Sequence, residues 1–67
     1  MLSARNQLAG TVKSVKLGAV MAEVIVDVAG HEVVAAITRS SVESLDLKVG
    51  DKVKAVVKAT EVMIAKD

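Results

Sequence analysis

Between Val20 and Val28 every second residue is valine or alanine, and this alternation constrains the fold more than any other feature of the chain. Successive side chains of a β-strand point to opposite faces, so the segment can bury one face and leave the other to Glu23 and Asp27. Fourteen of the 67 residues are valine, whose branched β-carbon favours strands. The chain is therefore predicted to be all-β.

Further strands are predicted on both sides of this segment, over residues 8–17, 32–37, 52–58 and 61–65. The apolar residues of the first one change face between Val12 and Val15, which indicates a bulge. Residues 32–37 are apolar on both faces, as expected if one face meets another copy of the chain. Glycines at Gly18, Gly30 and Gly50 mark the turns.

The alternation stops at residues 38–47, between the third and fourth predicted strands. Thr38 or Ser40 can cap a short helix there, and Ser40 with Glu43 has the spacing of a capping box. Val42 and Leu45 lie three residues apart, so both can face a core. Three strands, a helix and two strands form the element order of the OB-fold, a five-stranded partly open barrel. We expect one such domain over residues 1–67.

The chain lacks the usual means of stabilising a short domain. It has no cysteine for a disulfide and a single histidine, which excludes a zinc site of the common kinds. Its 22 valine, leucine and isoleucine residues supply about 30–65 kcal/mol on burial, against on the order of 100 kcal/mol for ordering the chain. We therefore predict an obligate homo-oligomer.

Composition also excludes several classes of function. Nine basic and eight acidic residues are well mixed and leave a net charge of +1, so the chain has no basic face for nucleic acid or an anionic membrane. It has no aromatic residue on which an OB domain could stack bases. No export signal or long apolar run is present, and we expect a cytoplasmic protein.

Catalysis is not expected either. His31, the one strong candidate base, follows a turn and has no organised serine or cysteine partner in the sequence. The four glycines are isolated, so no phosphate-binding loop is present, and the carboxylates are scattered. We predict a non-enzymatic protein without a metal site.

Three short segments are rich in hydrogen-bond donors: residues 3–7, the pair Thr38 and Ser41, and residues 58–60. Hydroxyls and free N–H groups at the start of a helix suit an anion. Taken singly, each segment also has an ordinary explanation, respectively a solvated terminus, a helix cap and a polar connection between strands. A histidine beside a turn, such as His31, is usually solvated. Next to a symmetry axis, however, His31 could contact an anion.

Read together, these segments resemble the molbindin family and its Mop domain. The similarity rests on SARNQL near the start, AITRSSVESLDLKVGD in the middle and VKATEVMI near the end. It implies an OB-type fold and subunits that exchange N-terminal strands in dimers. It also implies a hexamer built as a trimer of dimers, with molybdate or tungstate held at subunit interfaces and no other cofactor. The role implied for a free-standing domain is storage or buffering of the oxyanion.

The same resemblance implies which residues bind the oxyanion. By matching positions, the ligand contacts are Ser3, Ala4, Arg5, Asn6, Thr38, Ser41, Lys58, Ala59 and Thr60. The first four would come from one subunit, and some or all of the others from a neighbour. His31 is a candidate for a second site. The alternative function is a purely structural all-β oligomerisation module, which composition supports nearly as well.

Overall fold

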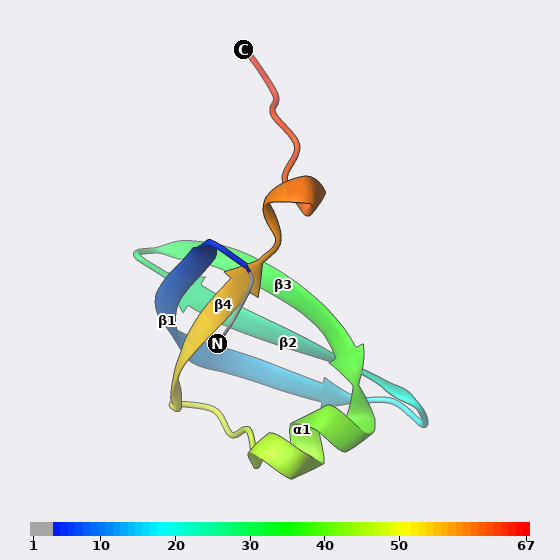
Figure 1. Ribbon diagram of the computed structural model, residues 1–67. Coiled ribbons are helices and arrows are strands. Elements are labelled where there is room, and N and C mark those ends of the chain that lie inside the picture. Colours follow the sequence, from blue (N-terminus) through cyan, green and yellow to red (C-terminus); the bar gives the residue numbers. More distant parts are fainter. Residues whose placement is uncertain (1–3) are drawn as a thin grey trace.

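Strands make up most of the computed structural model, which describes residues 4–67 (Figure 1). The elements follow the chain as β1 (Asn6–Leu17), β2 (Met21–Val28), β3 (His31–Thr38), α1 (Arg39–Leu45), β4 (Lys52–Val57) and the 3₁₀-helix η1 (Ala59–Glu61). Within the described part, the strands form one antiparallel sheet in the order β3-β2-β1-β4. The sheet is curled, with α1 at one end and the last residues leaving it at the other (Figure 1).

The long strand β1 joins the two halves of the sheet. Its first half pairs with β4, from Asn6 opposite Val57 to Thr11 opposite Lys52. Its second half pairs with β2. The register shifts between Val12 and Ser14, which confirms the predicted bulge. Because a bulge bends its strand, β1 can change partners there and curl the sheet.

The core is small and consists almost entirely of valine: the buried residues are Val12, Ala22, Val24, Val26 and Val42. The alternation predicted along the second strand is confirmed, since Ala22, Val24 and Val26 face this core while Glu23 and Asp27 are exposed. A side chain as small as valine fills little volume. The single chain therefore buries few large apolar groups.

Helix α1 contributes Val42 to the core, but the expectation that Leu45 joins it is wrong, because 67% of Leu45 is exposed. The helix ends at Asp46, which adopts the left-handed conformation with φ 52°. The next N–H, that of Leu47, returns to the carbonyl of Val42 at 3.1 Å, and Leu47 packs against the core in place of Leu45. In residues 4–67 no helix combines the length and apolar character needed to cross a membrane.

The prediction of a fifth strand over residues 61–65 is wrong. Over residues 4–67 the structure has a curled sheet of four strands and not the predicted five-stranded barrel. The chain turns through η1 after Lys58, and the residues beyond it leave the sheet (Figure 1). Apolar alternation indicates a tendency to be buried, whereas a strand also needs a hydrogen-bonded neighbour. Because the chain turns at η1, the residues that follow run away from the edge strands of their own sheet.

Candidate functional site

The first and last donor-rich segments meet at one end of the sheet. Asn6 lies opposite Val57 at the last rung of the β1–β4 pairing, so Arg5 and Lys58 continue from neighbouring strands. Both side chains are exposed. The backbone before β1 is held locally, since the Gln7 side-chain amide donates to the carbonyl of Ala4 at 3.2 Å. Arg5 and Lys58 therefore adjoin two neighbouring strands at this end of the sheet.

The connection after β4 is polar and tightly turned. Lys58 precedes η1 with an extended backbone, and its carbonyl accepts from the N–H of Glu61 at 2.9 Å. Its side chain makes no capping hydrogen bond. Ala59 and Thr60 lie within η1 and are exposed. The ammonium of Lys58 and the hydroxyl of Thr60 are thus available to a ligand.

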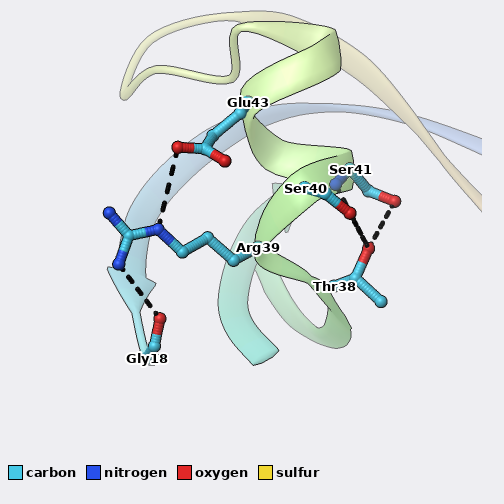
Figure 2. Close-up of polar contacts among 6 residues, drawn as sticks. All are labelled: Gly18, Thr38, Arg39, Ser40, Ser41 and Glu43. Atoms are coloured by element: carbon cyan, nitrogen blue, oxygen red, sulfur yellow. Dashed lines mark hydrogen bonds and ion pairs between the residues drawn. The ribbon is translucent and has the colours of Figure 1, made fainter. Parts of the chain in front are cut away.

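The middle donor-rich segment forms a cluster of three hydroxyls at the start of α1 (Figure 2). Thr38, rather than Ser40, caps the helix: its Oγ1 accepts from the N–H of Ser41 at 3.1 Å. The same oxygen lies 2.8 Å from the Ser41 Oγ and 3.2 Å from the Ser40 Oγ. Three hydroxyl protons are more than these mutual contacts use, so the cluster can donate outward. Ser40 belongs to this cluster, although the sequence indicated it only as a possible helix cap.

On the other side of the helix start, Arg39 fixes α1 to the β1–β2 turn (Figure 2). Its guanidinium donates to the carbonyl of Gly18 at 3.3 Å and lies 3.7 Å from the Glu43 carboxylate. Its backbone N–H donates to the carbonyl of Val20 at 2.7 Å. The i,i+4 spacing of Arg39 and Glu43 is a signal that the sequence offered for this contact. Arg39 thus links the start of α1 to the β1–β2 turn.

The two donor groups do not meet within one chain. Leu17 lies opposite Ala22, which lies opposite Ile37, so Thr38 stands level with the far end of β1. β1 is 12 residues long, and at about 3.3 Å per residue its two ends are far apart compared with the reach of a hydrogen bond. Figure 1 shows α1 and the start of β1 at opposite ends of the sheet. A site containing both groups therefore needs more than one chain.

Two other candidate residues stand outside these groups. Ser3 lies outside the described residues 4–67. His31 opens β3 opposite Val28, beside a turn in which Ala29 and Gly30 both have positive φ, and its side chain is exposed. The structure brings it to neither donor group.

Comparison with known proteins places the chain in a family. The model of the TOBE domain matches residues 2–64, nearly the whole sequence. The chain belongs to the TOBE domain family. Among curated relatives, molybdenum-pterin-binding protein 3 of Clostridium pasteurianum is 48% identical to this TOBE domain over 64 residues, which cover 94% of both chains. The resemblance to the molbindins seen in the sequence is thereby confirmed.

Solved structures agree with the fold of this TOBE domain. A molybdate-binding protein from Sporomusa ovata superposes with a TM-score of 0.95 at 53% identity, covering 98% of each chain. ModG, a cytoplasmic molybdate-binding protein with molybdate bound, superposes with a TM-score of 0.81 at 47% identity. That match covers 88% of this chain and 43% of ModG. Both relatives share the curled all-β sheet with one short helix.

Proposed function

We propose that this protein binds molybdate, or the similar tungstate, at interfaces between copies of the chain and transforms neither. The observation that carries the proposal is the pairing of Asn6 with Val57, which places Arg5 beside Lys58 at one end of the sheet. The hydroxyls of Thr38 and Ser41 would approach from a second copy. Two relatives that share the fold are described as molybdate-binding proteins, and this similarity supports the same ligand here.

The donor set suits a tetrahedral dianion. Molybdate is fully ionised at neutral pH, so it accepts hydrogen bonds and donates none. Arg5 and Lys58 balance its two negative charges, which limits the cost of removing it from water. Charge-assisted hydrogen bonds from these cations are roughly twice as strong as neutral ones. Backbone N–H groups, the Asn6 amide and the hydroxyls of Thr38, Ser41 and Thr60 supply the remaining donors.

The same chemistry sets selectivity. At neutral pH phosphate carries a proton, which would find no acceptor in a shell made only of donors. Sulfate has the charge and the acceptors of molybdate but is smaller, so its rejection depends on the size of the cavity. Tungstate has nearly the size of molybdate and should bind comparably.

The name of the Clostridium relative suggests a second ligand, molybdenum bound to a pterin. A pterin presents a flat ring and an amino group, which proteins commonly hold by stacking on aromatic side chains and by accepting hydrogen bonds. This chain has no aromatic residue, and its candidate donors offer no carboxylate. These features favour the free oxyanion.

We further propose that the protein is a cytoplasmic store or buffer for the anion. The resemblance to molbindins supports a hexamer arranged as a trimer of dimers, and ModG is itself described as cytoplasmic. His31 remains a candidate for a second site near a symmetry axis. In this arrangement each anion is held by several copies, so the assembly and the ligand stabilise one another.

Equilibrium dialysis against molybdate, followed by elemental analysis of the retained molybdenum, tests the proposal. We expect molybdenum to stay with the assembled protein in an excess of phosphate and to be displaced by tungstate. A structural oligomerisation module, the alternative function, would retain none. Assembled protein that holds no molybdenum or tungsten would overturn the proposal in favour of that module.

A further inference from the structure

Gln7 belongs to the first donor-rich segment, residues 3–7, but has no part in the proposed site. Its side-chain amide donates from Nε2 to the carbonyl of Ala4 at 3.2 Å. The backbone of Gln7 lies in β1 opposite Val56 of β4, so the sheet fixes this end of the hydrogen bond. The pairing of β1 with β4 begins at Asn6. The amide therefore reaches past the last rung of the sheet and holds the chain that precedes it.

Arg5 and Gln7 share one face of the chain at this end of the sheet. Exposure alternates along the segment, since Ala4 and Asn6 are half-buried whereas Arg5 and Gln7 are exposed. Side chains two positions apart in an extended chain point to the same side. The side chain of Gln7 thus neighbours the cation on which the proposed site depends.

The peptide bond between Ala4 and Arg5 makes this contact a constraint on the site. Its planar trans geometry points the C=O and N–H groups in opposite directions. A hydrogen bond that turns the Ala4 carbonyl toward Gln7 therefore turns the Arg5 N–H toward the other side. An oxyanion accepts hydrogen bonds from N–H groups and is repelled by carbonyl oxygens. With its carbonyl engaged by Gln7, this peptide unit presents its donor to a ligand and keeps its acceptor occupied.

We infer that Gln7 is a positioning residue of the oxyanion site. By holding the Ala4 carbonyl it fixes the backbone of Arg5 in the conformation that binds the anion, and it does not touch the anion itself. The inference rests on the proposed function, because it concerns the same site, and it adds a residue that is absent from the contacts implied by the resemblance. A segment that becomes ordered only when the ligand arrives loses affinity, whereas a segment ordered in advance keeps it.

The variant Gln7→Met tests this role, because methionine keeps the length of the side chain and removes the amide. We expect molybdate affinity, measured by isothermal titration calorimetry, to fall about fivefold, the effect of one neutral hydrogen bond. Light scattering on the same samples should give the wild-type mass. Ala9→Met is the matched control, since Ala9 is exposed on the same face of β1 two positions further along. Its affinity for molybdate should equal that of the wild type.

A nuclear magnetic resonance measurement reports on the contact itself. Ala4–Arg5 is the only place in the sequence where arginine follows alanine. Protein labelled with ¹³C at the carbonyl of alanine and with ¹⁵N in arginine therefore gives a single cross-peak in an HNCO spectrum. Loss of a hydrogen bond moves a carbonyl ¹³C resonance upfield. Before any molybdate is added, the Ala4 resonance should move upfield in Gln7→Met and stay in place in Ala9→Met, a pattern that a general loss of stability would not produce.

The two measurements separate this inference from the proposed function. Equal affinity of the wild type and Gln7→Met for molybdate would overturn the inference alone. So would an Ala4 carbonyl resonance that does not move, or a Gln7→Met variant whose assembly dissociates, since Gln7 would then serve the assembly and not the site. A wild-type protein that binds no molybdate would overturn the proposed function, and the inference with it.

Discussion

Arg5 and Lys58 lie 53 positions apart in the sequence, yet they continue from the same rung of one strand pairing. Neither side chain is buried. Exposed like charges side by side repel one another weakly in water, and that repulsion is relieved when an anion binds between them. We therefore propose that the two cations serve a ligand and not the stability of the sheet.

Arg5→Ala should weaken molybdate binding about tenfold or more, because it removes a charge and a forked donor worth about 1.5–3 kcal/mol. Arg5→Lys keeps the charge but loses the fork, and should fall between the variant and the wild type. Isothermal titration calorimetry measures both. Wild-type affinity in Arg5→Ala would remove this residue from the site.

Lys58→Ala should also weaken molybdate binding about tenfold while leaving the assembly intact, since the Lys58 side chain caps nothing in the structure. Lys66→Ala removes the same charge from an exposed position outside the candidate site and serves as the control. Calorimetry and light scattering are run on the same samples. If Lys58→Ala dissociates the assembly, the residue is structural and the proposed role fails.

The arrangement of the hydroxyls at the start of α1 depends on which residue caps the helix, and the sequence left that open. Thr38 and Ser40 were both acceptable caps, and only the backbone geometry selects Thr38. That selection places the Ser41 Oγ 2.8 Å from Thr38 Oγ1. The hydroxyls could be anticipated from residue types, whereas their mutual contacts follow from the cap between Thr38 and Ser41.

Ser41→Ala should lower molybdate affinity by several-fold without loss of helix stability, because the Ser41 backbone N–H still donates to Thr38. A neutral hydrogen bond contributes about 1 kcal/mol. Ser44→Ala on the same helix is the matched control. An equal loss of affinity in both variants would indicate a general effect on α1 and would contradict a direct contact from Ser41.

Gly10 allows β1 to approach β2 closely. A Cβ at Gly10 would lie 2.5 Å from the carbonyl oxygen of Asp27 and 2.7 Å from Val26 Cγ1. Backbone cannot move aside cheaply, so Gly10→Ala should lower the free energy of unfolding by about 1–3 kcal/mol. Urea unfolding followed by far-ultraviolet circular dichroism measures this change, with Ala9→Ser as the exposed neighbouring control. Equal stability of the two variants would show that β1 and β2 accommodate the added Cβ at Gly10 without loss of stability.

At the scale of the whole molecule, the sequence correctly predicted features that depend on local spacing within one chain. The alternation over residues 20–28 and the bulge near Val12 follow from local spacing, and both are confirmed. The fifth strand over residues 61–65 was predicted from the same kind of pattern and is wrong, because spacing does not indicate where a partner strand lies.

The candidate site shows the same limit. Each donor-rich segment was recognisable from residue types, and the resemblance grouped them into one site. The register alone shows that Arg5 and Lys58 share an end of the sheet while Thr38 stands at the other. Which segments come from the same copy is therefore decided by the strand pairing, which the sequence does not reveal.

An anomalous-scattering map from crystals grown with molybdate tests the central claim most directly. We predict a molybdenum peak between two copies, with Arg5 and Lys58 of one copy and Thr38 and Ser41 of another within hydrogen-bond distance of its oxygens. A peak contacted by one copy alone, or well-assembled crystals with no molybdenum peak, would contradict the account.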